Sequence, residues 1–398
     1  MSLQLYDAIV VGGGPAGATA ARDLAAAGRS VALIDRAGRI KPCGGAIPPR
    51  LLTDFAVPDT LLVARSRGAR IIAPSTRRVD MPIDGSYVGL VDREMFDEWL
   101  RQRAQSDGAE RITGIADRIT RDTDGHVTLH YRPVRTGRDG ESVAIRARAI
   151  VAADGAASTI ARQTLREFEH SRYVAAYHEI LEAPSDAREG YDPERCDVWY
   201  QGDISPDFYG WVFPHGRTVS VGVGSAERGF SLRSATARLR ERTGLADARV
   251  VRREGAPLPL KPLPRWDDGR NVVLAGDAAG VVAPASGEGI YYAMVGGRYA
   301  ADAVDEFLGR ADVRALANAR RRFMKEHGTV FWMLGMMQHF WYVSDRRRER
   351  FVKMCADPDV QRLTWESYLH KRMPRSNPLG QLKVFLKDTA HLLGLARV

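Results

Sequence analysis

The sequence predicts an α/β protein in which one domain is built on a parallel sheet, a second is an α+β domain with a mixed sheet, and a helical region closes the chain. Three observations lead to this prediction. A glycine-rich turn follows a short apolar run near the start, a region rich in Tyr, Trp and Val lies in the middle, and helical patterns fill the last quarter. The 398 residues suffice for two domains and an added helical part.

The parallel-sheet domain is predicted from the segment that begins at Asp7 and ends at Asp35. It reads as a strand, a tight turn with the sequence GGGPAG, a helix, and a second strand that ends in an acid. Gly12 allows the sharp turn, Gly14 lets the backbone approach a pyrophosphate, and Gly17 lets the helix pack closely on the strand. Asp35 follows Gly17 by 18 residues, where a carboxylate accepts hydrogen bonds from ribose hydroxyls. The segment indicates a Rossmann-like dinucleotide site, the alternative being an ordinary glycine turn.

The composition is that of a globular protein with excess positive charge. Hydrophobic residues make up 44% and charged residues 27%, and 58 basic against 49 acidic residues give a net charge of +9. This charge favours an anionic partner, namely a phosphate-bearing substrate or a membrane surface, because no nucleic-acid-binding module is recognisable. The three cysteines form neither a disulfide framework nor a metal-ligand pattern, so we expect a reducing compartment and no metal. We expect neither a signal peptide nor a membrane-spanning helix.

Three further segments carry candidate residues for the dinucleotide site. Lys41-Pro-Cys-Gly-Gly is a stiff loop, in which Cys43 lies near the reactive ring of the cofactor or is an incidental thiol in a structural turn. The helix predicted over residues 91–100 places Arg93 near its start, as a ligand of a phosphate or ring edge or as a solvated charge. A buried strand that begins at Ala149 runs into a tight turn at Asp154.

The middle region, residues 172–265, is predicted to form most of the second domain. Alternating aromatic residues put Tyr209, Trp211 and Phe213 on one face of a sheet, which is either a core seam or the wall of a long apolar pocket. The segment 221–224 is interpreted as a glycine-bearing strand that lets a ligand approach.

The chain then returns to the first domain and ends in helices. Asp277 closes a buried strand, where its carboxylate is placed to bond a ribityl hydroxyl, and the backbone from Gly287 to Ile290 opens a helix that faces a pyrophosphate or an isoalloxazine edge. An aromatic and methionine stripe at residues 330–342 lies between basic clusters. Such a stripe is typical of an interfacial helix or of a helix packed on the second domain.

Taken together, these motifs resemble the FAD signatures of the para-hydroxybenzoate-hydroxylase-like flavoproteins. The matching segments, in the family's order, are GGGPAG with Asp35, the Arg93 segment, Ala153-Asp-Gly-Ala-Ala-Ser158, and Gly276-Asp-Ala-Ala-Gly with Pro-Ala-Ser-Gly-Glu-Gly-Ile290. The pair Lys41-Pro-Cys-Gly-Gly and Pro206-x-x-Tyr-x-Trp-x-Phe-Pro214 resembles the geranylgeranyl reductase family. The run from Ser205 to His215 and the tail through Leu392 are similar to its photosynthetic branch, the geranylgeranyl-bacteriochlorophyll reductases, and the resemblance covers essentially the whole chain.

The resemblance implies bound FAD and a domain division. We expect an FAD-binding domain at residues 1–75, 90–170 and 270–312, a prenyl-chain domain at residues 76–89 and 171–269, and a helical, membrane-interfacial region at residues 313–398. The residues expected to bind the cofactor are Gly12, Gly14, Pro15, Ala16, Gly17, Asp35, Arg36, Cys43, Gly44, Gly45, Arg93, Asp154, Gly276, Asp277, Gly287, Gly289 and Ile290.

The implied activity is reduction of three isolated C=C bonds of a geranylgeranyl chain to give phytyl, with NADPH as a transient electron donor. The implied substrate is geranylgeranylated bacteriochlorophyllide or geranylgeranyl diphosphate, handled peripherally at the cytoplasmic side of the photosynthetic membrane, in association with other pigment-biosynthesis enzymes. An unactivated alkene needs a hydride and a proton. Cys43 is the first candidate for the proton donor and Tyr209 the second, and Tyr209, Trp211 and Phe213 line the chain pocket.

Two alternatives stay open. One is a flavin monooxygenase on the same scaffold, and the other, from a different class, is a non-catalytic flavoprotein that carries pigment.

Overall fold

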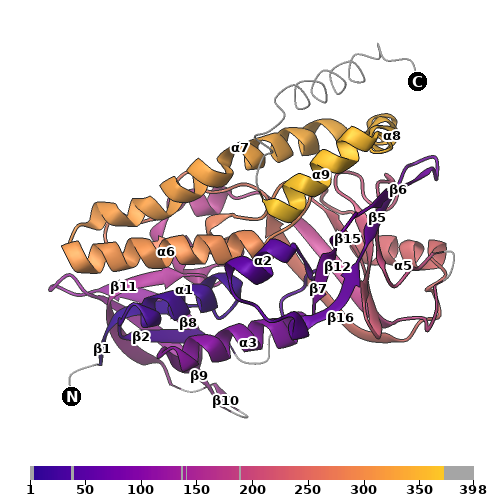
Figure 1. Ribbon diagram of the computed structural model, residues 1–398. Helices are drawn as coiled ribbons and strands as arrows, with labels where there is room; N and C mark the ends of the chain where they lie inside the picture. Colours follow the sequence, from indigo (N-terminus) through magenta and orange to yellow (C-terminus); the bar gives the residue numbers. More distant parts are fainter. Residues whose placement is uncertain (1–3, 37–39, 136–137, 140, 188–189, 372–398) are drawn as a thin grey trace. The chain divides into compact units, whose positions relative to one another are not determined.

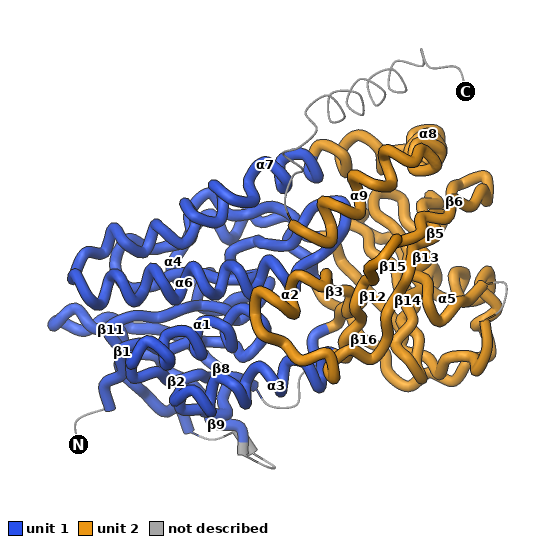
Figure 2. Tube along the Cα trace, in the orientation of Figure 1, with its two compact units in different colours: residues 1–41, 93–173, 257–335 blue, residues 42–92, 174–256, 336–398 orange. Residues whose placement is uncertain are grey.

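The computed structural model describes residues 4–36, 40–135, 138–139, 141–187 and 190–371, and the chain divides into two compact units (Figure 1, Figure 2). Unit 1 comprises residues 1–41, 93–173 and 257–335. Unit 2 comprises residues 42–92, 174–256 and 336–398. Each unit is therefore assembled from three segments that alternate along the sequence.

Unit 1 is built on a sheet whose central strands are parallel. Among the described residues its order is β10-β9-β8-β2-β1-β11-β17. The strands are β1 Leu5–Val11, β2 Val31–Asp35, β8 Glu110–Arg121, β9 Val127–Arg135, β10 Arg138–Asp139, β11 Val143–Ala152 and β17 Val272–Leu274. β1 pairs in parallel with β2 and β11, and β11 pairs in parallel with β17. The apolar run of β1 is buried, as expected for a central strand covered on both faces.

The helices of unit 1 pack through small and aromatic residues. They are α1 Pro15–Ala26, α3 Arg93–Ser106, α4 Thr159–Thr164, α6 Ile290–Arg310 and most of α7 Asn318–Trp341, with the short 3₁₀ turns η2 Arg166–His170, η3 Gly276–Ala279 and η4 Val313–Ala317. A Cβ added at Gly297 of α6 would lie 2.2 Å from the carbonyl oxygen of Ala16 in α1, so the two helices approach as closely as glycine allows. Tyr292 of α6 meets Phe331 of α7 edge to face, with ring centroids 4.9 Å apart.

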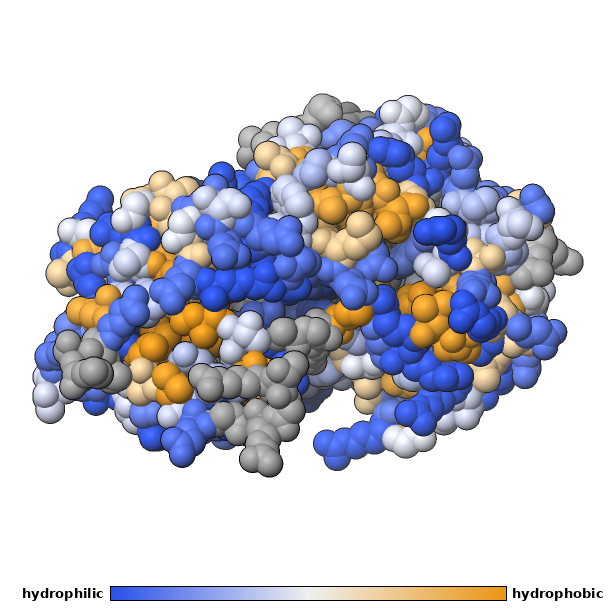
Figure 3. Space-filling view, turned by 90° about the horizontal axis from the view of Figure 1, so that it is seen from below, coloured by the Kyte–Doolittle hydropathy of each residue, from blue (hydrophilic) through white to orange (hydrophobic). Residues whose placement is uncertain are grey.

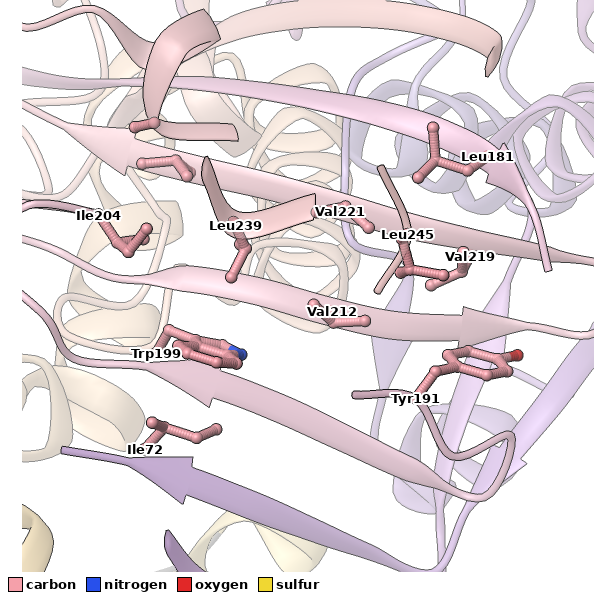
Figure 4. Close-up of a cluster of buried hydrophobic side chains, with 12 residues drawn as sticks. Ile72, Leu181, Tyr191, Trp199, Ile204, Val212, Val219, Val221, Leu239 and Leu245 are labelled. Carbon is pink, nitrogen blue, oxygen red and sulfur yellow. The ribbon is translucent and has the colours of Figure 1, made fainter. Parts of the chain in front are cut away.

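Unit 2 is built on a mixed sheet with the order β16-β12-β15-β14-β13-β5-β6 in the described chain. The strands are β5 Gly68–Ile72, β6 Arg78–Pro82, β12 Tyr173–Glu182, β13 Arg195–Trp199, β14 Gly210–His215, β15 Thr218–Ser225 and β16 Val250–Pro259. On one face, Val212 and Val221 of the sheet join Leu239 of α5 Leu232–Arg242 in a buried cluster (Figure 4). The odd-numbered residues of β14, which include Trp211 and Phe213, therefore lie on the other face.

Smaller elements complete unit 2. They are the three-stranded sheet of β3 Ala46–Ile47, β7 Val88–Val91 and β4 Leu62–Ser66, with α2 Pro49–Asp54, η1 Asp59–Leu61, α8 Asp345–Met354 and α9 Pro358–His370. A buried cluster joins Leu90 of β7 to Leu369 of α9. The described part of the tail after residue 336 is thus packed into this unit.

The structure confirms the predicted α/β class, the mixed second sheet and the helical character of the described tail. The division of the chain differs from the predicted boundaries in three places. Residues 257–269, predicted to lie in the second domain, fall in unit 1. Residues 42–75 fall in unit 2, where β5 joins the second sheet by pairing in parallel with β13, and β3 and β4 pair with β7. The predicted region at residues 313–398 is divided after residue 335, and its residues 372–398 lie outside the described chain.

Candidate functional site

The carboxyl ends of the parallel strands in unit 1 bring several of the predicted cofactor residues together. β2, β1, β11 and β17 are neighbours in this order. The predicted residues that end or follow these strands are Asp35, Gly12, Asp154 and Gly276, in the same order. In open α/β sheets, nucleotides bind outside the carboxyl ends of the strands. The predicted residues therefore lie at the edge of the sheet where such a ligand is expected.

The turn between β1 and α1 requires glycine at two of the predicted positions. Gly12 has a left-handed backbone with a φ of 100°, and an added Cβ would lie 2.3 Å from the carbonyl oxygen of Ala153. A Cβ added at Gly17 would lie 1.8 Å from the carbonyl oxygen of Gly12. Neither position has room for a side chain, so these glycines set how closely α1 approaches the ends of β1 and β11.

Gly14 has different surroundings, which fit a phosphate. It is the N-cap of α1, Pro15 occupies the first helical position, and no side chain caps the helix. Within the described chain, a Cβ added at Gly14 would meet no atom closer than 4 Å. The start of α1 presents backbone N–H groups and the positive end of the helix dipole. The space beside Gly14 therefore suits the pyrophosphate of a dinucleotide such as FAD.

Arg101 of α3, which the sequence motifs do not indicate, holds Asp35 in place. Its Nη1 lies 3.3 Å from Oδ2 of Asp35 and donates to the carbonyl oxygen of Gly13 at 3.2 Å. Glu98 accepts a hydrogen bond from Nε of Arg101 at 3.0 Å and two from Arg111 at 2.7 and 2.8 Å. A row of alternating charges thus links α3 to the strand that ends in Asp35. The three-residue spacing of Glu98 and Arg101 favours a charge pair on one helix face, and this part of the row could have been predicted from the sequence.

Glu98→Gln should make unfolding less sensitive to acid. Hydrogen bonding to Arg111 lowers the pKa of Glu98 from 4.5 to about 2, and Arg101 adds to this shift. A carboxylate with a depressed folded-state pKa contributes stability above its unfolded pKa, and this contribution is lost as the pH falls through the folded pKa. The wild type should therefore lose free energy of unfolding between about pH 4.5 and pH 2, and the variant should lose less over that interval. The side chain is 35% exposed, so solvent screening reduces the effect.

Urea unfolding at a series of pH values measures this difference. Glu241→Gln, which removes an exposed carboxylate from α5, is the matched control and should retain the wild-type pH profile. A Glu98→Gln profile that parallels the wild type would contradict the assignment.

Two other predicted cofactor residues bond to groups of the protein itself. Arg93 and Asp97, one turn apart on α3, are both buried and form a bidentate pair at 2.8 and 2.7 Å. The carboxylate of Asp154 accepts hydrogen bonds from the hydroxyl of Ser158 at 2.5 Å and from the backbone N–H of Thr159 at 2.7 Å, at the start of α4. These contacts give Arg93 and Asp154 a structural role, and their contact with a cofactor stays a prediction.

Asp277 pairs with Lys41, which was not predicted as a site residue although it begins the cysteine motif. Nζ of Lys41 donates to Oδ2 of Asp277, whose side chain is only 4% exposed. Gly276, with a φ of 62°, packs against the first turn of α1, because an added Cβ would lie 2.7 Å from the Cβ of Ala16. Asp277 is therefore held near the same helix start as the glycine turn.

Gly287, Gly289 and Ile290 lie where α6 begins. Gly287 has a φ of 64°, and its N–H donates to the carbonyl oxygen of Ala283 at 3.0 Å, so this donor is used within the loop. Gly289 is the N-cap of α6, and no side chain caps the helix. Gly289 and Ile290 thus lie at a second helix start that suits an anionic or polar group. Arg36 follows β2 and is exposed.

In unit 2, the cysteine loop, residues 42–45, packs against β14. A Cβ added at Gly44 would lie 2.9 Å from the ring of Phe213. Nε2 of His215 lies 3.0 Å from the carbonyl oxygen of Gly44, and because a carbonyl only accepts, this nitrogen carries the proton. Burial lowers the pKa of His215, which favours the neutral imidazole. Gly45, with a φ of 69°, donates its N–H to Sγ of Cys43 at 3.4 Å.

The aromatic face, defined as Tyr209, Trp211 and Phe213, is mostly buried. Tyr209 is 8% and Trp211 7% exposed, and neighbouring rings along the face have centroids 6.2 and 6.5 Å apart. Tyr209 stacks on Phe208 at 4.2 Å and lies 5.9 Å from Tyr200. The Tyr209 end therefore packs as protein core, whereas the Phe213 end adjoins the cysteine loop.

The glycines of β15 make room for rings of the protein itself. A Cβ added at Gly222 would lie 2.2 Å from the ring of Trp211, and one added at Gly224 would lie 2.6 Å from the ring of Phe208. The interpretation of residues 221–224 as a strand open to a ligand is therefore wrong, because aromatic side chains fill that space.

Comparisons with known proteins agree with these features. The FAD binding domain family matches residues 5–323. A geranylgeranyl diphosphate reductase from Rhodobacter capsulatus is 56% identical over 390 residues, which cover 98% of each chain. A chloroplastic geranylgeranyl diphosphate reductase from Oryza sativa subsp. japonica is 37% identical and covers 96% of this chain and 85% of its own. A geranylgeranyl bacteriochlorophyll reductase-like protein from Thermoplasma acidophilum shares the fold, with a TM-score of 0.82, 22% identity, and coverage of 99% and 100%.

Proposed function

The chain belongs to the geranylgeranyl reductase family of FAD-dependent oxidoreductases, and we propose that it uses NADPH to saturate three C=C bonds of a geranylgeranyl chain, giving phytyl. We propose further that bacteriochlorophyllide or a diphosphate carries this chain. Two relatives are named as geranylgeranyl diphosphate reductases, and one similar structure is named after the bacteriochlorophyll reaction, which supports both carriers.

The observation that carries the proposal is the contact of the cysteine loop with the aromatic face in unit 2. A thiol that could act in proton transfer lies on a loop whose Gly44 packs against the ring of Phe213. A prenyl chain has no polar groups, so its binding relies on apolar and aromatic side chains. The pairing of a thiol with an aromatic surface suits an alkene substrate better than a polar one.

When bound and reduced by NADPH, the flavin would supply hydride to one carbon of the alkene. The residues of unit 2 have the complementary task of delivering a proton to the other carbon and keeping water away. Cys43 is half-buried, and the N–H of Gly45 fixes its sulfur. Tyr209 is the second candidate, but its ring stacks on Phe208 and lies 5.9 Å from the ring of Tyr200. Cys43 is therefore the better placed proton donor on the aromatic side.

We propose that the start of α1 and the row that holds Asp35 bind FAD, and that NADPH docks only transiently. In the described structure, aromatic rings occupy the space beside the glycines of residues 221–224. This segment therefore does not form a second dinucleotide-binding turn. Anaerobic mixing of the oxidised holoenzyme with NADPH should bleach the flavin absorbance, and later addition of geranylgeranyl diphosphate or geranylgeranyl-bacteriochlorophyll should restore it. Restoration only after oxygen is admitted would favour the monooxygenase.

We also propose that the helical region that begins at residue 313 meets the cytoplasmic side of a photosynthetic membrane peripherally, alongside other pigment-biosynthesis enzymes. No helix in the described chain is long and apolar enough to cross a bilayer. The side chains of the stripe at residues 330–342 differ in exposure. Trp341 and Tyr342 are buried, whereas Trp332 and Met336, one turn apart, are 64% and 44% exposed. Exposed apolar side chains in a stripe that basic clusters flank in the sequence, at residues 320–325 and 346–350, suit an anionic lipid surface.

Replacing Trp332 and Met336 together by serine should weaken binding to vesicles that contain an anionic phospholipid by at least about tenfold, because less apolar area enters the lipid. Co-sedimentation measures this affinity. Apolar patches also occur elsewhere, as on the face drawn in Figure 3. Met95→Ser is therefore the control, since Met95 is 58% exposed on α3. Equal binding by the double variant and the wild type would contradict the membrane proposal.

A further inference from the structure

Four side chains form a hydrogen-bonded row across neighbouring strands of unit 2. Nε1 of Trp211 on β14 donates to Oγ of Ser220 on β15 at 3.0 Å. Nδ1 of His178 on β12 lies 2.9 Å from the same oxygen, and its Nε2 lies 2.8 Å from Oε2 of Glu254 on β16. Each of the strands β14, β15, β12 and β16 contributes one member, and these strands are consecutive in the sheet.

The chemistry of the groups fixes the donors at two points of the row, the indole of Trp211 and Nε2 of His178. An indole nitrogen only donates, so Oγ of Ser220 accepts from Trp211. The hydroxyl proton of Ser220 is then available for Nδ1 of His178, and Nε2 donates to the carboxylate of Glu254. Arg252 completes the far end, with its Nε 2.7 Å from Oε1 of Glu254. Every member of the row has a partner, and the row ends at the indole.

Gly222 is what allows the indole to reach this row. A Cβ at this position would lie 2.2 Å from Cζ2 of Trp211 and 2.5 Å from Cβ of His178. The indole therefore lies over β15 in space that any other residue would occupy. Ser220 is 0%, His178 2% and Trp211 7% exposed, so these three members are closed off from solvent, and the side chain of Glu254 is 11% exposed. Buried polar groups of this kind rigidify the side chains that they connect when all are satisfied.

We propose that Ser220, His178 and Glu254 are positioning residues that fix the ring of Trp211, and through it the place of the reacting double bond of a prenyl chain. This inference rests on the proposed function. Because the indole N–H is used by Ser220, the ring presents carbon atoms rather than a donor to its apolar side. A rigid aromatic surface that makes no hydrogen bond to the chain positions each double bond in turn. It still lets the chain advance between reductions.

A double-mutant cycle tests whether Ser220 acts through Trp211. Ser220→Ala should lower kcat by about tenfold and increase the release of partly reduced chains, because the ring loses its orientation. In a Trp211→Phe background the same substitution should add no further loss. Independent, multiplying effects of the two substitutions would overturn the proposal. Ser66→Ala is the control, since Ser66 is a buried serine with two hydrogen bonds on β4, and it should leave kcat and the product distribution unchanged.

A spectroscopic measurement needs no substrate and separates this inference from the proposed function. The difference between the tryptophan emission of the wild type and that of Trp211→Phe isolates the signal of Trp211. Glu254→Gln, which keeps the shape of the far end of the row, should shift that signal in the same direction as Ser220→Ala. An unshifted signal in both variants would overturn the inference even if the wild type reduces geranylgeranyl chains. If the emission shifts in both variants but the wild type reduces no geranylgeranyl chain, the role of the row in fixing Trp211 stands and the proposed function is refuted.

Discussion

Gly17→Ala should yield a protein that retains no FAD and unfolds at lower denaturant concentration than the wild type. The new Cβ would lie 1.8 Å from the carbonyl oxygen of Gly12 and 3.1 Å from the Cβ of Ala153. The backbone at the end of β1 cannot yield without disturbing the central strand, so α1 must move away. Overpacking typically costs about 1 to 3 kcal/mol, and a contact with rigid backbone at 1.8 Å belongs at the upper end of this range.

Gly14→Ala is the matched variant that separates folding from cofactor binding. Its added methyl meets no protein atom within 4 Å in the described chain, so the free energy of unfolding of the apoprotein should stay near the wild-type value. The methyl does enter the space that we assign to the pyrophosphate, so FAD affinity should fall by at least about 100-fold, as for the loss of a buried charged contact.

Flavin absorbance per protein after gel filtration and urea unfolding of the apoprotein measure the two effects. Gly309→Ala, at an exposed position in α6, should change neither. If Gly14→Ala retained full FAD, the pyrophosphate would not lie beside this residue.

Cys43→Ser should separate the two halves of the catalytic cycle. Flavin reduction by NADPH should proceed at the wild-type rate, because it needs no proton from the cysteine loop. Product formation should fall by about 10² to 10⁴, the usual contribution of a positioned general acid. Serine keeps the size of the side chain and the hydrogen bond from the N–H of Gly45, so a structural role alone predicts little change.

Stopped-flow spectroscopy of each half-reaction provides the measurement. Cys196→Ala serves as the control, because burial raises the pKa of the Cys196 thiol to about 12 and keeps it out of the chemistry. Equal rates of both half-reactions in Cys43→Ser and in the wild type would remove Cys43 from the mechanism and leave Tyr209 as the candidate.

The glycine turn could be predicted because its residues are contiguous. The strand, turn and helix that carry Gly12, Gly14 and Gly17 are specified locally, and their conformations follow from the lack of a side chain. The partners of the polar residues were harder to predict. Arg101 reaches Asp35 across 66 residues and Lys41 reaches Asp277 across 236, and no local pattern encodes either pairing.

In the sheet of unit 2, too, local sequence patterns predicted the strand but not its contacts with distant segments. The alternation in β14 correctly placed Trp211 and Phe213 on one face, whereas Tyr209 lies just before the strand. The function of the β15 glycines could not be read from the sequence, because the register of β14 against β15 decides that Gly222 lies opposite Trp211. The parallel pairing of β5 with β13, which adds β5 to the sheet of unit 2, likewise depends on a contact between distant segments.

The central claim is that this enzyme adds hydrogen to the isolated double bonds of a geranylgeranyl chain. Mass spectrometry after anaerobic incubation of the holoenzyme with NADPH and either geranylgeranyl diphosphate or geranylgeranyl-bacteriochlorophyll tests it most directly. We predict successive products that have gained two, four and six hydrogens, with the last accumulating. An unchanged mass for both substrates, or a product that gains oxygen when air is admitted, would contradict the claim.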